Sequence, residues 1–294
     1  MAHKENQLIF HSMASRPNSL AIDIDITRKL GFDGLETSGP KIAAFLEAGF
    51  TEDELKRRMD GLFLPGIGFL IDLERQGSLR DEMLGEAEKL CQLAVAAGAK
   101  GIEAITGPLD IRTFEQGARE RYPQLYRGLI DLPRDEQLTL TAANLKMVAD
   151  IAANYGLKVY LEALSWTPLN TLDDQLRVLD LCERSNVQIV IDFWHSYTSG
   201  DTPERIARLK KDIIYGVHLC DSLRFDGGIP NEAILRDVPT GKGVLNLREW
   251  VDAVKSTGFC GWWSCELFCR RQHQDNSYVV ARDLKALMEQ LVHG

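Results

Sequence analysis

The chain has 294 residues, of which 45% are hydrophobic and 26% are charged, and its formal net charge is −9. This length accommodates one large domain or two small ones, and the apolar fraction excludes a mostly disordered protein. Negative charge repels phosphate backbones, so nucleic acid is not an expected partner. No apolar run is long enough to cross a bilayer, so no membrane partner is expected either.

The N-terminal stretch MAHKENQLIF lacks the apolar core of a secretory signal, so export by that route is not expected. The six cysteines form no CxxC pair, and most lie within apolar strand or helix patterns. This pattern indicates that the cysteines are reduced thiols and that the protein resides in a reducing compartment. We therefore expect a cytoplasmic protein.

Eight apolar, β-rich runs alternate with amphipathic helical stretches along the chain. In chain order, the predicted strands are 8–11, 34–37, 62–67, 101–105, 158–163, 188–192, 213–219 and 262–267. Strands that alternate with helices are typical of parallel sheets built from βαβ crossovers.

A weak internal repeat links these strands. GFDGLE, GAKGIE, GLKVYLE and GFCGWWSCE each run from a helix-ending glycine through a strand to a glutamate. Apolar strands that each close on a carboxylate favour a single-domain (β/α)8 TIM barrel with polar groups at one rim. The alternative is a doubly wound open sheet, which normally has a glycine-rich phosphate loop after its first strand, and IFHSMASRP is not such a loop.

One segment departs from the alternating pattern. Residues 106–139, after the fourth strand, contain several arginines among aromatic residues and prolines. We interpret this segment as an insertion, either a solvated one or one that forms a lid or a subunit contact over the barrel mouth.

Four consecutive strands, the fifth to the eighth, end on a potential metal ligand. These residues are Glu162 in VYLEAL, Asp192 in IVIDFWH, His218 in YGVHLCD and Glu266 in WSCELF. In a barrel they meet at the C-terminal rim, where barrel enzymes keep their active sites. Three converging carboxylates repel one another unless a cation binds between them. Oxygen and imidazole donors favour one divalent ion, with Mn2+ preferred and Mg2+, Co2+ or Zn2+ as alternatives.

Five stretches carry a resemblance to a known family: GLKVYLEAL, VQIVIDFWHSYTSGD, YGVHLCDS, DVPTGKGVLNL and GWWSCELF. With these motifs the chain resembles the xylose-isomerase-like sugar phosphate isomerase/epimerase superfamily, and within it most closely the inosose isomerases and ketose 3-epimerases. The resemblance implies a (β/α)8 enzyme with one divalent metal held by Glu162, Asp192, His218 and Glu266. It also implies that the two glutamates form an acid/base pair on opposite faces of the substrate.

The same resemblance implies further roles. His195, in the DxxH motif, would polarise the substrate, and Arg236, in RDVPTGKG, would contact it. Arg224 competes for the arginine role, because the stretch between His218 and Arg236 is longer than in the epimerases. The 3-epimerases carry a second glutamate shortly after the fifth strand, where this chain has LSWTPLNT, and this difference argues against 3-epimerase activity specifically.

Other side chains are candidates for binding substrate. Trp166 and Trp194 lie near the ends of the fifth and sixth strands, where an indole can stack on the C–H face of a sugar. His11 ends the first strand and is expected to line the pocket. Glu36 and Glu103 end the second and fourth strands, either in buried rim ion pairs or in contact with substrate hydroxyls.

These residues together predict a divalent-metal-dependent isomerase or epimerase that acts on a keto-sugar or keto-polyol through an enediolate intermediate. A metal-dependent lyase is the alternative, as an inosose or dehydroshikimate dehydratase or an enzyme of 3-keto-glycoside cleavage. More remote alternatives are a non-catalytic sugar-binding protein and an abasic-site endonuclease, which needs a multi-metal cluster and a basic groove. The expected partner is a small carbohydrate substrate. A homo-oligomer, or a partner subunit that completes the site, is compatible with the sequence.

Overall fold

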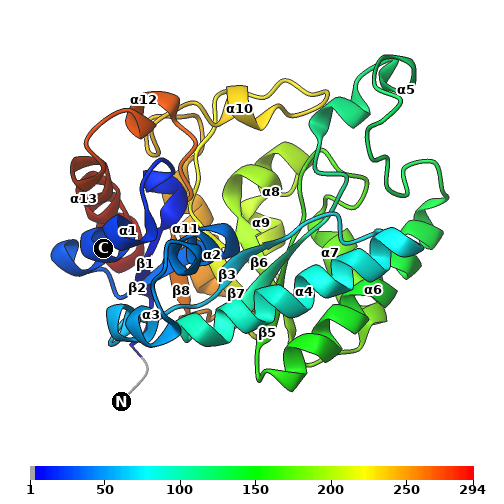
Figure 1. The fold of residues 1–294 in the computed structure, drawn as a ribbon. Helices are drawn as coiled ribbons and strands as arrows, with labels where there is room; N and C mark the ends of the chain where they lie inside the picture. The colour runs from blue at the N-terminus through cyan, green and yellow to red at the C-terminus, as the bar shows by residue number, and fades with distance from the viewer. Residues whose placement is uncertain (1–3) are drawn as a thin grey trace.

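The computed structural model describes residues 4–294, which form a closed parallel barrel with the strand order β1 to β8 (Figure 1). Pairing between β1 and β8 closes the ring. The strands are β1 (Gln7–His11), β2 (Gly34–Ser38), β3 (Ile67–Leu70), β4 (Gly101–Ile105), β5 (Lys158–Glu162), β6 (Val187–Asp192), β7 (Ile214–His218) and β8 (Trp262–Ser264). The predicted (β/α)8 barrel is therefore confirmed.

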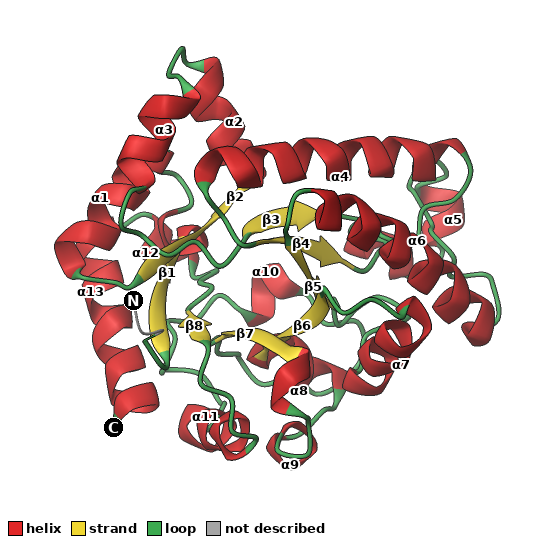
Figure 2. Ribbon diagram, turned by 90° about the horizontal axis from the view of Figure 1, so that it is seen from below, coloured by secondary structure: helices red, strands yellow, loops and turns green. Residues whose placement is uncertain are grey.

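Helices enclose the ring of strands, as the view from below shows (Figure 2). The longer helices are α1 (Leu20–Leu30), α2 (Gly39–Glu47), α3 (Glu52–Met59), α4 (Ser78–Ala97), α6 (Arg134–Asn154), α7 (Leu172–Cys182), α8 (Phe193–Ser199), α11 (Leu247–Ser256) and α13 (Ser277–Met288). Short helical turns are η1 (Ser12–Ser15), η2 (Ile111–Phe114), α5 (Ala118–Arg121), α9 (Pro203–Ile206), η3 (Lys211–Ile213), α10 (Glu232–Leu235), α12 (Arg270–His273) and η4 (Glu289–His293). From residue 4 onward, none of the helices combines the length and apolar character of a membrane span.

The third strand lies later in the chain than the sequence predicted. The predicted run 62–67 overlaps β3 only at Ile67, and Phe63 makes an isolated bridge to Gly34. Pro65 has no N–H to donate to a ladder. At Gly66 an added Cβ would lie 2.3 Å from the ring of Tyr160, so the chain passes directly against that ring before the strand begins.

A separate apolar cluster fills the inside of the barrel. Ile9, Tyr160, Val190 and Trp262 come from β1, β5, β6 and β8, and side chains of non-adjacent strands meet only inside the ring. Tyr215 stacks on Tyr160 with ring centroids 4.9 Å apart. This inner cluster lies beneath the rim that carries the strand-end carboxylates. The main apolar core lies between the strands and the surrounding helices.

Gly216 on β7 is a position where the barrel interior accepts no side chain. A Cβ at Gly216 would lie 2.0 Å from the indole of Trp262. We expect Gly216→Ala to lower the free energy of unfolding by at least about 2 kcal/mol, because a packed core resists added volume. Gly85 in α4 is the matched control, because no atom lies within 4 Å of a Cβ there, and Gly85→Ala should stabilise the helix by about 0.5–1 kcal/mol. Urea denaturation measures both, and equal stability of Gly216→Ala and wild type would contradict this packing.

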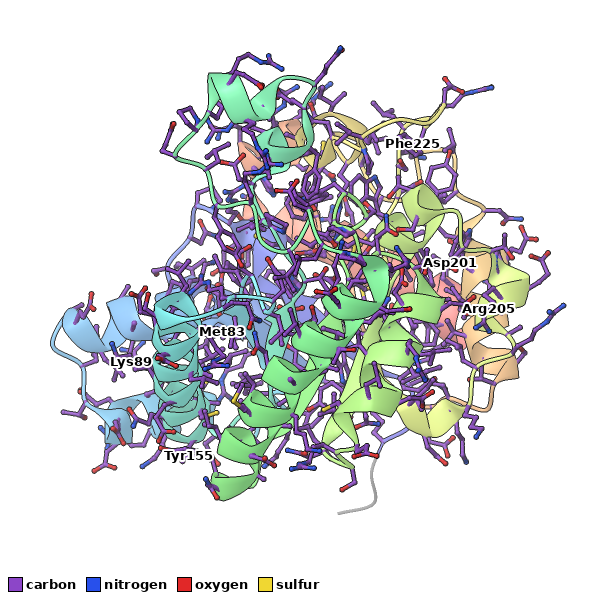
Figure 3. The ribbon with its side chains drawn as sticks, turned by 90° about the vertical axis from the view of Figure 1, so that its right-hand side faces the viewer. Met83, Lys89, Tyr155, Asp201, Arg205 and Phe225 are labelled. Carbon is purple, nitrogen blue, oxygen red and sulfur yellow. The ribbon has the colours of Figure 1, made fainter. Side chains whose placement is uncertain are left out.

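The connection from β4 to α6 contains η2 and α5 and rises above the rim at the upper right of Figure 1. Its charged side chains pair mostly with one another, as in the ion pair between Arg119 and Asp131 at 2.7 Å. From the side (Figure 3), Phe225 marks the loop after β7 at the same upper end, and Met83 and Tyr155 mark α4 and the end of α6 below it. The rim therefore carries the longest loops of the molecule.

Candidate active site

The four predicted metal ligands meet at the C-terminal rim of the barrel. Glu162, Asp192 and His218 are the last residues of β5, β6 and β7, and Glu266 follows β8 by two residues. Each of the four offers a ligand atom that lies within 4.8 Å of the other three. The Nδ1 atom of His218 lies 3.1 Å from Glu162 Oε1 and 4.0 Å from Asp192 Oδ2. Three carboxylates and one imidazole in this arrangement offer the donor set of a divalent-cation site.

Arg236 holds two of these carboxylates in their charged form. Its Nη2 atom lies 2.8 Å from Glu266 Oε2 and 3.5 Å from Asp192 Oδ2, and the side chain is 2% exposed. Burial opposes ionisation of Asp192, but Arg236, His195 and His218 together outweigh it and lower the pKa to about 2. The pKa of Glu266 is also lowered, because Arg236, His11 and His218 together outweigh the effect of burial. Both carboxylates are therefore ionised and suited to bind a cation.

Glu36, at the third position of β2, fixes the orientation of His218. The Nε2 atom of His218 lies 3.2 Å from Glu36 Oε2, and Glu36 also accepts hydrogen bonds from Tyr160 Oη and Ser264 Oγ. Burial opposes ionisation of Glu36, but His218 and His11 lower its pKa to about 2. The contact with Glu36 turns Nδ1 towards Glu162, where it donates to that carboxylate when protonated and can bind a cation when deprotonated. The sequence marked Glu36 as a strand-end glutamate, but it did not indicate this contact.

His195 lies in the first turn of α8, directly after β6. The Oδ1 atom of Asp192 accepts the His195 backbone N–H at 2.7 Å and so caps the helix. The Nδ1 atom of His195 accepts the backbone N–H of Ser165 at 3.1 Å. Because a backbone N–H only donates, the neutral ring carries its proton on Nε2. Burial lowers the pKa of His195, which favours this neutral form.

A cavity of about 460 Å³ opens over these groups. Of the residues predicted from the sequence, it is lined by Glu162, Glu266, His195, His11 and Trp166. The indole Nε1–H of Trp166 donates to the Leu109 carbonyl at 3.1 Å, which fixes the plane of the ring. The structure therefore brings both proposed acid/base glutamates, the candidate polarising histidine and one candidate stacking ring to a single cavity.

Three residues predicted to contact substrate lie outside the lining of that cavity as the described chain forms it. Arg236 is buried beneath it among carboxylates, and its Nη1 atom pairs with Glu232 at 2.9 Å. Trp194 is fully buried, and its ring centroid lies 6.3 Å from that of Trp166, so it packs behind the cavity wall. The side chain of Arg224 is 79% exposed and pairs with Asp226 at 2.7 Å. These positions place Arg236 behind the carboxylates and Arg224 at the surface.

Glu103 on β4 is a buried acid that also lines the cavity. Its Oε1 atom has no hydrogen-bond partner among the described residues, and its Oε2 atom lies 2.6 Å from where a Cβ at Gly68 would be. Burial and the nearby charge of Glu162 raise its pKa well above the usual range. The glycine on β3 thus makes room for the carboxyl group of Glu103.

Asp221 organises the loop that follows β7. Its carboxylate accepts backbone N–H groups from Ser222, Gly241, Gly243 and Leu245 at 2.8–3.2 Å. A Cβ at Gly243 would lie 2.2 Å from Asp221 Oδ1, so only glycine fits there. The loop segment that carries Arg236 is therefore anchored next to the site.

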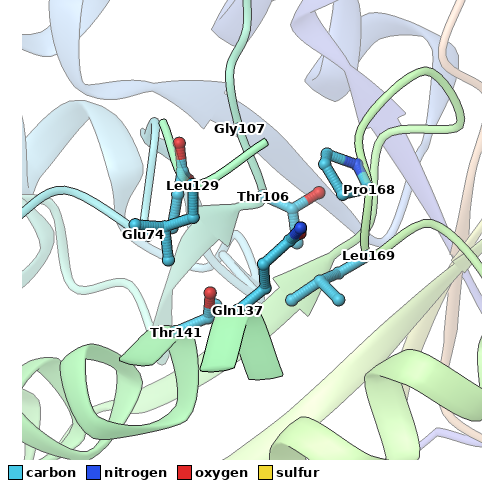
Figure 4. Close-up of a pocket in the computed structure, with 8 residues that line it drawn as sticks. All are labelled: Glu74, Thr106, Gly107, Leu129, Gln137, Thr141, Pro168 and Leu169. Atoms are coloured by element: carbon cyan, nitrogen blue, oxygen red, sulfur yellow. The ribbon is translucent and has the colours of Figure 1, made fainter. Parts of the chain in front are cut away.

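A second cavity, of about 10 Å³, lies between Glu74 and the start of α6 (Figure 4). This volume suits roughly one water molecule. Figure 4 shows Glu74, Thr106, Gln137 and Thr141 around it. Burial and the negative charge of Asp72 raise the pKa of Glu74 to about 7.

This raised pKa predicts a pH-dependent stability. Because the native pKa of about 7 exceeds the ordinary 4.5, the native protein keeps a proton that the unfolded chain has already released between those pH values. The contribution of Glu74 to stability should therefore decline by up to about 3 kcal/mol as pH rises through that range. Glu74→Gln removes this contribution, so its unfolding free energy should rise relative to wild type with increasing pH. Urea denaturation across the range tests this, and a constant difference would contradict it.

Comparisons with known proteins agree with this geometry. A family model described as the xylose isomerase-like TIM barrel matches residues 24–290. The chain is 25% identical over 237 residues to the 3-dehydro-D-guloside 4-epimerase of Escherichia coli, covering 76% of this chain and 80% of that protein. It is 23% identical over 270 residues to the inosose isomerase of Bacillus subtilis, covering 89% of each.

Among solved structures, the barrel superposes on the IOLI protein, crystallised with a binding zinc atom, with a TM-score of 0.84 and 20% identity, covering 97% of this chain and 98% of that one. That likeness concerns the fold, and the family match extends over nearly all of the sequence. The chain belongs to the xylose isomerase-like TIM barrel family.

Proposed function

We propose that this chain is a divalent-metal-dependent isomerase or epimerase that acts on a keto-sugar or keto-polyol through an enediolate. The observation that carries the proposal is the double position of Glu162 and Glu266. Both line the large cavity, and both belong to the cluster of four ligand atoms. The curated relatives named isomerase and epimerase support the same reaction class.

The donor set fits a divalent ion. Glu162, Asp192, His218 and Glu266 would hold it, and the two carboxylates next to Arg236 are already ionised. Oxygen-rich donors favour Mn2+, with Mg2+, Co2+ and Zn2+ as alternatives, and the IOLI protein, which has the same fold, was crystallised with a zinc atom. When bound, such an ion supplies Lewis acidity that polarises the substrate carbonyl and stabilises the enediolate.

The protein's own groups perform the proton transfers. One glutamate of the pair Glu162 and Glu266 removes the proton next to the carbonyl, and the other returns a proton from the opposite side. His195 donates its Nε2–H to the substrate oxygen on which negative charge develops. Return of the proton to the same carbon gives an epimer, and return to the neighbouring carbon gives an isomer.

Two further residues serve binding and positioning. Trp166 offers its ring to the C–H face of the sugar. Arg236 is a positioning residue, because it holds Glu266 and Asp192 without reaching the cavity. We propose a small uncharged carbohydrate as the substrate, since the carboxylates around the floor of the cavity repel anionic polymers such as nucleic acids.

Solvent-deuterium exchange tests the proposal. The protein is stripped with a chelator, reloaded with each of the four metals in D2O, incubated with inososes, ketohexoses and 3-keto-glucosides, and quenched for mass spectrometry. We expect one deuterium beside the carbonyl, only with metal present, and otherwise unchanged mass. Loss of water or of an aglycone would instead establish a lyase. Absence of exchange with every substrate would overturn the proposal.

A further inference from the structure

The large cavity has two chemically different sides. Its floor consists of the strand-end carboxylates and histidines described above. One wall is apolar and comes from β3 and three neighbouring connections. Its residues are Phe69 in β3, Ile71 directly after it, Leu109 after β4, and Leu164 and Trp166 after β5. We call these five residues the apolar wall.

The apolar wall is separate from the main hydrophobic core. Leu164 and Trp166 pack in a small cluster of their own, with Ile71 against it. Phe69 is 47% exposed and Leu109 is 38% exposed, although both are large apolar side chains. Exposed apolar surface that borders a cavity marks a ligand-binding groove more often than a folding requirement.

The size of the cavity exceeds the needs of the reacting ring. A volume of about 460 Å³ falls within the roughly 300–1,000 Å³ typical of pockets that enclose drug-sized ligands. A six-carbon polyol is smaller than a drug-sized ligand and fills only part of this volume. Water solvates the apolar wall poorly, so an apolar group placed there gains free energy with the area it buries.

We propose that the substrate is a keto-sugar that carries an apolar substituent, such as an aryl glycoside. The sugar ring lies over the carboxylates with its C–H face on Trp166, and the aglycone lies against Phe69, Ile71 and Leu109. The hydrogen bond from Trp166 Nε1 to the Leu109 carbonyl holds the indole in place, so its face is ready for stacking. This assignment rests on the proposed function, which it narrows from keto-sugars in general to glycosides with a hydrophobic aglycone.

Binding of two matched probes tests the inference. The dissociation constants of phenyl and methyl 3-keto-β-D-glucopyranoside are measured by isothermal titration calorimetry on the Zn2+-loaded protein. The two probes share the sugar and differ only in the aglycone. We expect the phenyl glycoside to bind at least about tenfold more tightly, because a stacked aromatic ring buries a large apolar area.

Variants of the wall make the test specific. Phe69→Ser and Leu109→Asn should each reduce the phenyl preference severalfold and leave the affinity for the methyl glycoside unchanged. Both side chains are well exposed, so neither substitution removes core packing. The matched control is Val95→Ser, at a residue in α4 that is 47% exposed and outside the cavity lining of the described chain, and it should keep the full preference.

The outcomes separate this inference from the proposed function. Equal binding of the two probes by the wild type, or a preference that survives both wall variants, overturns the inference. An apolar wall covered by a second copy of the chain would also give equal binding. If the methyl glycoside or an inosose still exchanges deuterium in that case, the proposed function stands. A phenyl preference without deuterium exchange in any substrate overturns the proposed function and leaves a glycoside-binding site.

Discussion

Glu266→Gln is expected to slow solvent-deuterium exchange into the keto-sugar by about 10²–10⁴-fold, the usual contribution of a positioned acid/base group. Glutamine keeps the size of the side chain and its contact with Arg236, which lies 2.8 Å from the carboxylate. It removes the basic oxygen that accepts the proton. Mass spectrometry of the quenched reaction measures the rate.

Glu162→Gln should show a loss of the same order, since Glu162, at the end of β5, lines the same cavity and belongs to the same ligand cluster. The metal content of both variants is measured by elemental analysis, so that loss of the ion is distinguished from loss of the base. Glu120→Gln is the control for a neutralised carboxylate, because Glu120 is exposed on α5. Wild-type exchange in a metal-loaded Glu266→Gln would contradict the acid/base role.

Arg236→Met is expected to lower the free energy of unfolding by about 3–5 kcal/mol, the cost of leaving buried charges without their partner. The guanidinium contacts Asp192, Glu266 and Glu232, and its side chain is 2% exposed. Methionine fills much of the volume of arginine. The decrease in unfolding free energy would therefore result from the missing charge and not from a cavity. Urea denaturation of the metal-free protein measures it.

Two comparisons make this second prediction specific. Arg224→Met should change stability by less than about 0.5 kcal/mol, because Arg224 is 79% exposed and pairs with Asp226, which is also exposed. Addition of a divalent cation should stabilise Arg236→Met more than it stabilises the wild type, since the ion replaces the missing positive charge between the carboxylates. If Arg236→Met is as stable as the wild type, these carboxylates do not depend on the arginine.

Local signals were sufficient to predict the barrel. The glycines that end helices before β2 and β4, Gly31 and Gly98, adopt the left-handed conformation at φ 68° and 78°, as their place in the repeat indicates. The position of β3 was not predictable in the same way. Its start depends on the ring of Tyr160, which occupies the space beside Gly66 and comes from a strand almost a hundred residues later in the chain.

In the candidate site, too, some features were predictable from the sequence and others were not. Convergence of the four strand-end ligands follows from parallel strands that finish at one rim, so the sequence predicted it. The pairing of Glu36 with His218 joins residues 182 positions apart, and the pairing of Arg236 with Asp192 joins residues 44 positions apart. No local pattern specifies such contacts. The resemblance to the family predicted that Arg236 contacts substrate. A sequence motif identifies the residue, but it does not indicate how deeply the side chain is buried.

The two sides of the cavity are built from parts of the chain with different freedom to change. The carboxylates stand on strands whose register is fixed by neighbours on both sides, whereas much of the apolar wall belongs to connections, and Leu109 opens the long one between β4 and α6. Connections tolerate insertion and replacement far better than barrel strands do. Exchange of this connection between relatives would therefore alter which aglycones fit while the proton chemistry stays in place. In evolutionary terms, changes in the proposed substrate are expected first in this connection and only later in the strands.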